Sequence, residues 1–131
     1  MGYVRPCAAD RHRYSDDLPD PLFQELLNRQ LDDHLILTKV TCPIGVIGVI
    51  FESRPDALVQ IAALCMKSGN CAVLKGGSEA KNTNKALFNI IYNAAVESGL
   101  PESFGLLIED RAEIGKLLKC HDSVDLLIPR G

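Results

Sequence analysis

The sequence has 131 residues and a formal net charge of −3; 47% of the residues are hydrophobic and 24% are charged. This length is enough for one globular domain with a buried core, and a mildly acidic chain without tryptophan offers little to nucleic acid or to anionic lipid. The longest apolar run, residues 44–51, is too short to span a bilayer, so we expect neither a nucleic acid nor a membrane as partner.

Residues 1–17 mix basic and acidic side chains without a regular period, which predicts a flexible arm. The arm has no apolar segment of the kind found in a secretory signal. The five cysteines are odd in number and lack the spacing of a disulfide framework. They indicate reduced thiols and a cytoplasmic location.

The next elements are a predicted helix and two predicted strands. Apolar residues recur at helical spacing in residues 21–33, which predicts a short amphipathic helix containing Leu22, Phe23, Leu26 and Leu27. Residues 35–51 read as a strand, a break and a second strand, with β-branched residues dense between Ile44 and Ile50.

Helices and strands then alternate to the end of the chain. Pro55 predicts the start of a helix because proline is tolerated in the first turn, and Gly69 predicts its end. A buried strand is expected over Cys71–Leu74, and apolar periodicity predicts a long helix around residues 86–95. Residues 104–110 read as a third strand, 111–120 as a shorter helix and 124–128 as a fourth strand.

This alternation predicts an α/β fold with a doubly wound, mostly parallel sheet. Ligands bind such sheets beyond the carboxyl ends of the strands. Residues 75–78 follow one predicted strand and residues 129–131 follow another. We therefore expect these two loops to lie along the same edge of the sheet.

The loop Lys75-Gly76-Gly77-Ser78 is the first candidate site. Lysine supplies positive charge, and glycines allow a phosphate or ribose to approach the backbone near the start of a helix. The alternative is a tight turn between strand and helix that carries a solvent-exposed lysine. Neither glycine-rich nucleotide fingerprint is present in the sequence, so the pattern alone leaves both interpretations open.

Two further loops contain arginine. Arg130 could hold a phosphate through two parallel hydrogen bonds, or it could be an ordinary surface residue. Ser53 and Arg54 lie with Glu52 between a predicted strand and a predicted helix, at the same expected edge. They could bind a ligand, or Glu52 and Arg54 could form an internal ion pair.

The cysteines supply no convincing nucleophile or metal site. Cys65 and Cys71 fall on apolar elements and are expected in the core. Cys120-His121-Asp122 contains the residue types of a catalytic triad, but sequence neighbours rarely face one another. No C-x-x-C or H-x-x-x-H spacing suggests zinc, so we assign neither a catalytic residue nor a metal ligand.

Three blocks occur in the order and spacing of a known family: "LDDHLILTKVTCPIGVIGVIFESRPDALVQIAALCMKSGNCAVLKGGSEA", "SGLP" and "VDLLIPRG". They resemble γ-glutamyl phosphate reductase (glutamate-5-semialdehyde dehydrogenase), the proline-synthesis branch of the aldehyde dehydrogenase superfamily. The resemblance implies that residues 18–131 form an incomplete, Rossmann-like NADP-binding domain. It also implies that the catalytic and oligomerisation domains are absent.

The resemblance assigns roles to the candidate loops. It places Lys75 at the adenosine ribose of the cofactor, with Gly76 and Gly77 beside it. Ser78 takes the position of a glutamate that would repel a 2′-phosphate, which favours NADP(H), although a shift of one residue would put Glu79 there. The loop ending in Arg130 and Gly131 would pass the cofactor phosphates, and Ser53 and Arg54 would contact substrate or phosphate.

The activity that the resemblance implies is NADPH-dependent reduction of L-glutamyl 5-phosphate, a small molecule, to L-glutamate 5-semialdehyde and phosphate in proline biosynthesis. The family's reaction uses a cysteine that lies beyond the "IPRG" block, so the chain alone is expected to be inactive. The alternative is a short, non-catalytic homologue that binds nucleotide or a full-length partner. An uncovered edge at the fourth strand would permit a homo-oligomer.

Overall fold

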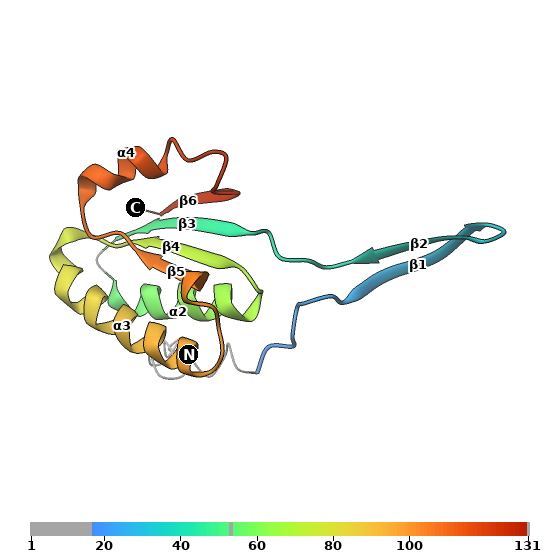
Figure 1. Cartoon of the computed structure of the whole chain (residues 1–131), viewed down its shortest axis with the longest axis horizontal. Helices are drawn as coiled ribbons and strands as arrows, with labels where there is room; N and C mark the ends of the chain where they lie inside the picture. Colours follow the sequence, from blue (N-terminus) through green and yellow to red (C-terminus); the bar gives the residue numbers. More distant parts are fainter. Residues whose placement is uncertain (1–16, 53, 131) are drawn as a thin grey trace, which may run out of the picture.

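The computed structural model describes residues 17–52 and 54–130. They form a four-stranded α/β unit from which a two-stranded hairpin projects (Figure 1). The flexible arm predicted for residues 1–17 falls almost wholly outside the described residues, as do Cys7, Ser53 and Gly131.

The hairpin consists of β1 (Glu25–Asp32) and β2 (Leu35–Val40), which pair antiparallel. All residues of both strands are exposed. The helix predicted for residues 21–33 is therefore wrong. A two-residue turn at Asp33 and His34 reverses the chain, and His34 adopts a φ of 64° there. The helical spacing of the leucines did not produce a helix, because this segment has no core against which a helix could pack.

The sheet of the α/β unit confirms the predicted fold class. Its order is β5-β4-β3-β6, and every neighbouring pair is parallel. The strands are β3 (Val46–Phe51), β4 (Cys71–Lys75), β5 (Gly105–Leu107) and β6 (Leu126–Arg130). β5 is shorter than the strand predicted for residues 104–110. The strand order reverses between β3 and β6, and ligands bind doubly wound sheets at such a reversal.

Helices cover both faces of the sheet (Figure 1). α2 (Pro55–Lys67) begins at the predicted proline, and Gly69 follows its end with a φ of 67°. α3 (Lys81–Glu97) follows a short 3₁₀ turn, η1 (Ser78–Ala80). α4 (Ile114–Leu117), after η3 (Arg111–Glu113), is shorter than the helix predicted for 111–120, and η2 (Glu102–Phe104) precedes β5.

The core lies between α2 and the two central strands. Leu58 of α2 and Leu74 of β4 are fully buried. They pack with alternate residues of β3 and β4 and with the inner face of α2: Ile47, Val49, Phe51, Ala62, Cys65 and Ala72. Because successive side chains of a strand point to opposite faces, Ile50 and Lys75 belong to the other face of the sheet.

Within the described residues, no helix is long and apolar enough to cross a membrane. The same part of the chain contains no group of three or more His, Cys, Asp or Glu side chains placed to hold a metal ion.

Candidate functional site

The carboxyl ends of β3, β4 and β6 bring the predicted loops together. Ile50 pairs with Lys75 on one side, and Phe51 pairs with Arg130 on the other. Lys75 and Arg130 therefore lie along the same edge of the sheet, as the strand pattern predicts. They flank β3 from opposite sides, and the strand alternation assigns their side chains to opposite faces.

An open groove of about 650 Å³ runs along this edge. Its volume lies in the usual range of small-molecule sites, which is roughly 300–1,000 Å³. Six of the residues predicted from sequence line it: Arg54, Lys75, Gly76, Gly77, Ser78 and Arg130. Glu52, considered in the sequence beside Arg54, and Glu79, considered as an alternative to Ser78, also line the groove. The other lining residues were not expected at the site: Ile50, Phe51, Arg111 and Ile114.

Arg111 is the most informative of the residues that sequence reasoning missed. It begins η3 just after β5, so its loop also follows the carboxyl end of a strand. The rule that ligands bind beyond the carboxyl ends of parallel strands would have identified this loop if it had been applied to β5. The loop was overlooked because its short, partly polar sequence contains no glycine or proline. Ile114 at the start of α4 supplies an apolar wall nearby.

Positive charge exceeds negative charge in the groove. Its basic residues are Arg54, Lys75, Arg111 and Arg130, whereas its acidic residues are Glu52 and Glu79. This surplus contrasts with the formal net charge of −3 on the whole chain. A surplus of positive charge in a cleft attracts ligands of negative charge, so the groove is suited to an anion.

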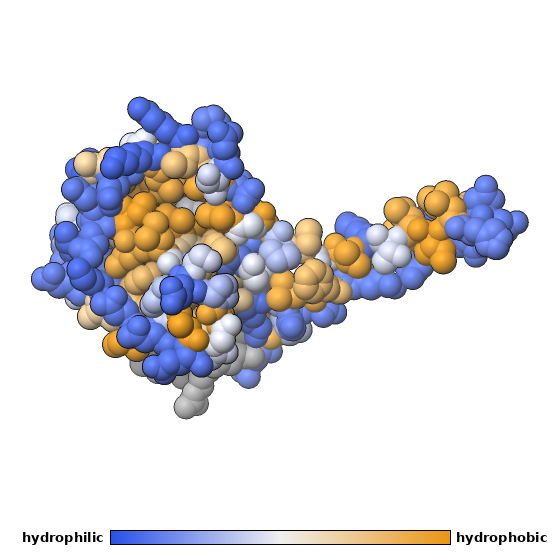
Figure 2. All heavy atoms as spheres, viewed as in Figure 1, coloured by the Kyte–Doolittle hydropathy of each residue, from blue (hydrophilic) through white to orange (hydrophobic). Residues whose placement is uncertain are grey.

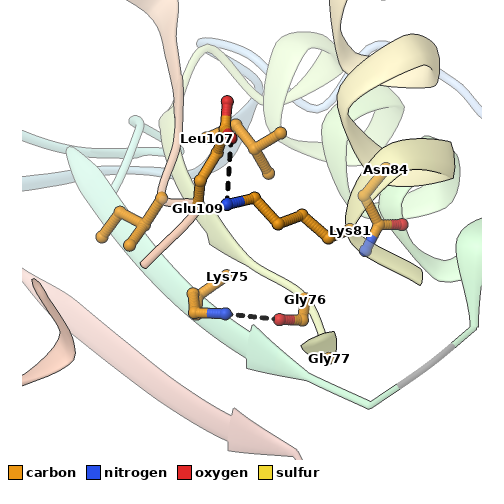
Figure 3. Close-up of a pocket in the computed structure, with 8 residues that line it drawn as sticks. Lys75, Gly76, Gly77, Lys81, Asn84, Leu107 and Glu109 are labelled. Carbon is orange, nitrogen blue, oxygen red and sulfur yellow. Dashed lines mark hydrogen bonds and ion pairs between the residues drawn. The ribbon is translucent and has the colours of Figure 1, made fainter. Parts of the chain in front are cut away.

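Lys75 is buried at the base of this groove, with only 7% of its surface exposed. Its Nζ donates a hydrogen bond of 2.7 Å to the carbonyl oxygen of Gly76 (Figure 3). The alternative of a solvent-exposed lysine is therefore wrong. An ammonium group has three N–H donors, so this bond leaves capacity for a ligand oxygen.

Gly76 is a glycine for an intramolecular reason. A Cβ atom at this position would overlap the side-chain nitrogen of Asn84 and lie 3.1 Å from two ring carbons of Phe51. The absence of a side chain therefore lets the turn pack between α3 and β3. Gly77 follows in extended conformation and leads into η1, where Ser78 and Glu79 line the groove.

Ion pairs fasten the helix that follows this turn. The Nζ atom of Lys85 lies 2.7 Å from Oε1 of Glu109, and Nζ of Lys81 lies 3.4 Å from Oε2 (Figure 3 shows the Lys81 pair). The hydrogen bond from Lys85 holds the pKa of Glu109 below its ordinary value, and Lys81 acts in the same direction. The start of α3 is thus connected to the segment after β5.

Arg54 occupies the N-cap position of α2 at the same edge. Its backbone N–H donates to the carbonyl of Glu52 at 2.7 Å, and its own carbonyl accepts from Ala57 at 3.0 Å. Within the described residues, the side chains of Glu52 and Arg54 form no ion pair with each other. This geometry does not support the alternative of an internal Glu–Arg pair, and both side chains line the groove.

The four cysteines in the described part of the chain lie away from the groove lining. Cys65 is buried as predicted, and burial raises the pKa of its thiol, with nearby Cys71 adding to the effect. Cys71 is only half-buried, while Cys42 and Cys120 are exposed. His121 directs Nδ1 to the carbonyl of Lys119 at 2.8 Å, so its contact is with the local backbone. None of these residues is paired as a nucleophile and its base.

The sequence is similar to those of known enzymes. The γ-glutamyl phosphate reductase of Ruminiclostridium cellulolyticum is 58% identical over 114 residues, which are 87% of this chain and 26% of that protein. The chain therefore spans about a quarter of the length of the curated relatives it matches. No protein-family model matches the sequence.

Solved structures agree with the sequence relatives. A γ-glutamyl phosphate reductase from Thermotoga maritima superposes with a TM-score of 0.87 at 36% identity, covering 95% of this chain and 30% of its own. The Saccharomyces cerevisiae enzyme gives 0.86 at 39% identity, covering 95% and 32%. A propionaldehyde dehydrogenase from Rhodopseudomonas palustris, at 20% identity and a TM-score of 0.72, shares the fold. The resemblance recognised in the sequence motifs is confirmed.

Proposed function

We propose that this chain, a homologue of one segment of the γ-glutamyl phosphate reductases, is the NADPH-binding part of such an enzyme. The whole enzyme would convert L-glutamyl 5-phosphate to L-glutamate 5-semialdehyde and phosphate in proline biosynthesis. The observation that carries the proposal is the basic groove at the strand-order reversal of a parallel sheet.

The lining residues fit a phosphate-bearing dinucleotide. The groove is large enough for part of such a ligand, and it provides cations from the carboxyl ends of four strands. Lys75 can donate to ribose or 2′-phosphate oxygens from its buried position. Gly77 and Ser78 lead into the start of α3, where backbone N–H groups favour anions.

Each side chain would then have a distinct role. Lys75 and Ser78 would hold the adenosine end, and the Ser78 hydroxyl could donate to a 2′-phosphate where a carboxylate would repel it. Arg130 and Gly131 would meet the cofactor phosphates across β3. Arg54, with Ser53, would contact the phosphate of substrate or cofactor.

When bound, NADPH supplies the hydride, and the residues of this chain bind and orient it. No cysteine of the described residues lines the groove. We therefore expect the 131-residue chain alone to bind nucleotide without reducing the acyl phosphate.

Titration of the purified chain with NADPH and NADH by calorimetry tests the proposal. We expect NADPH to bind more tightly, and Lys75→Ala to weaken NADPH binding by roughly ten-fold because a charge-assisted hydrogen bond is lost. Lys39→Ala, on the exposed hairpin strand β2, is the matched control and should leave binding unchanged. Unaltered NADPH affinity in Lys75→Ala would contradict the assignment of this loop.

A further inference from the structure

Asn84 is the least exposed of the buried polar residues in the described part of the chain, with 2% of its surface accessible. Its Oδ1 atom is buried and has no hydrogen-bond partner in the structure. A buried acceptor without a partner destabilises a fold, whereas an apolar side chain of similar shape carries no such cost. Stability alone therefore does not explain an asparagine at this position.

The contact between Asn84 and the glycine turn offers another explanation. Asn84 lies in the first turn of α3, and its carboxamide points back toward the backbone that precedes the helix (Figure 3). A Cβ atom on residue 76 would overlap its Nδ2 atom. On the other side, the ring of Phe51 closes the same space, with two ring carbons 3.1 Å from that Cβ position. Gly76 is thus held between a helix and a strand.

The position of Gly76 in turn sets the position of Lys75. The carbonyl oxygen of Gly76 accepts the 2.7 Å hydrogen bond from Lys75 Nζ, so a displaced Gly76 peptide would displace the ammonium group. Asn84 itself lies outside the groove lining. It borders a small cavity of about 10 Å³ on the other side of the turn, whereas Lys75, Gly76 and Gly77 border both spaces.

We propose that Asn84 is a positioning residue for nucleotide binding: it fixes the Gly76 peptide and, through it, the buried ammonium of Lys75. The inference rests on the proposed function, because the ligand is the NADPH assigned to the groove. The ion pairs of Lys81 and Lys85 with Glu109 fasten the whole start of α3, but Asn84 is the helical side chain that reaches Gly76.

The test compares Asn84→Leu with Asn89→Leu, a matched control at an exposed asparagine of the same helix. Leucine keeps the branching of asparagine and removes the unpaired oxygen. We expect Asn84→Leu to unfold at or above the wild-type temperature and yet to bind NADPH roughly ten-fold more weakly in calorimetry, because a small misplacement of a binding group is costly. The control should match the wild type in binding.

A spectroscopic readout separates positioning from general packing. The ¹H–¹⁵N signal of the Lys75 ammonium, assigned by its loss in Lys75→Arg, should shift in Asn84→Leu and stay in place in Asn89→Leu. Wild-type NADPH affinity in Asn84→Leu would overturn the inference. If Asn84→Leu loses folding as well as binding, Asn84→Ala, which only removes atoms, becomes the test variant. It must then unfold at or above the wild-type temperature and still bind NADPH more weakly.

The failure of the proposed function would look different. If the wild-type chain binds neither NADPH nor NADH, the cofactor assignment fails. The ammonium signal still decides the positional role of Asn84 in that case. An unchanged Lys75 signal in Asn84→Leu and Asn84→Ala would refute it.

Discussion

Lys75 and Gly76, at the end of β4, are held by contacts with a neighbouring strand and with a helix. Lys75 is buried although it is charged, and its ammonium group is hydrogen-bonded to the next residue along the chain. Gly76 is enclosed by Phe51 and Asn84, so its lack of a side chain is a packing requirement. A charged group and a bare backbone are thus held together beside the groove.

Gly76→Ala tests this packing. The φ angle of Gly76 lies outside the left-handed region, so the cost of alanine should come from overlap and not from backbone strain. We expect a loss of about 1–3 kcal/mol in the free energy of unfolding, which is typical of overpacking. Urea denaturation measures it. In an Asn84→Ala background the same change should cost less, because one of the two obstructing side chains is gone; an equal cost in both backgrounds would contradict the proposed contact.

Ser78 provides the test of cofactor preference. In Ser78→Glu a carboxylate would face the 2′-phosphate, so we expect NADPH affinity to fall by roughly ten-fold or more while NADH affinity changes less. Calorimetric titration of both nucleotides gives the ratio. Ser123→Glu, at an exposed loop position, makes the same change in net charge and should preserve the ratio. A parallel loss of both nucleotides would indicate that Ser78 does not face the 2′-phosphate.

Sequence reasoning located these residues but not their surroundings. The strand-end rule correctly placed Lys75 and Arg130 on one edge. It could not reveal that residue 76 must be glycine because the Asn84 side chain fills the space of a Cβ atom there. That contact depends on how α3 packs against the turn, which the sequence does not show. Arg111 was missed for a different reason: its loop also follows a strand end, but its sequence has no glycine or proline to draw attention to it.

Helix α3 is attached at its start by charge as well as by apolar packing. Lys81 and Lys85 lie one turn apart on the helix, and both contact Glu109 beyond β5. The hydrogen bond from Lys85 is the main reason why the pKa of Glu109 is lowered. Since the carboxylate is partly exposed, the attachment is weak and sensitive to salt.

The pH dependence of stability follows from this lowered pKa. The stabilisation by Glu109 is complete above the ordinary carboxyl pKa of 4.5 and is lost as the pH falls through the lower folded-state pKa. At neutral pH, Glu109→Gln should therefore reduce the melting temperature by no more than a few degrees.

Thermal unfolding across the acid range measures this effect. The difference between the wild type and Glu109→Gln should disappear once Glu109 is protonated. Glu113→Gln, at an exposed position, is the control and should show no such convergence. A difference that persists at the acid end would contradict the assignment.

The regular elements of the α/β unit were largely predictable because several local signals agree there. Pro55 marks the start of α2, Gly69 marks its end, and a continuous apolar stripe lies between them. The segment before β2 lacked such agreement. Its leucines matched a helical period over a short stretch and Pro21 stands at its start, but no glycine marks an end to the helix. The actual reversal uses His34 in a conformation that glycine usually provides.

The described chain consists of a packed α/β unit and a hairpin with little burial of its own. Both hairpin strands are exposed throughout, and apolar residues lie along the hairpin behind a hydrophilic tip (Figure 2). Each strand's main contacts are with the other strand. The core that stabilises the molecule is located between α2 and the sheet.

Replacing residues 24–41 by two glycines tests this division. The amide of Phe23 bonds to the carbonyl of Thr41 at 3.2 Å, so the ends of the removed segment are close together. We expect the shortened chain to melt within a few degrees of the full chain, because no buried side chain is removed. Circular dichroism follows the transition. Unfolding of the α/β unit on removal of the hairpin would show that the two parts depend on each other.

The register of β4, β3 and β6 also fixes the distance between Lys75 and Arg130. Lys75 and Arg130 are two strand spacings apart, or about 10 Å at the usual strand separation. A molecule that touches both must be long enough to cross the end of β3 and flexible enough to bend over it. Because the two side chains also belong to opposite faces of the sheet, a chain of two phosphates flanked by sugars suits this span better than a single phosphate ion. This edge of the sheet therefore selects ligands by reach before any hydrogen bond distinguishes among them.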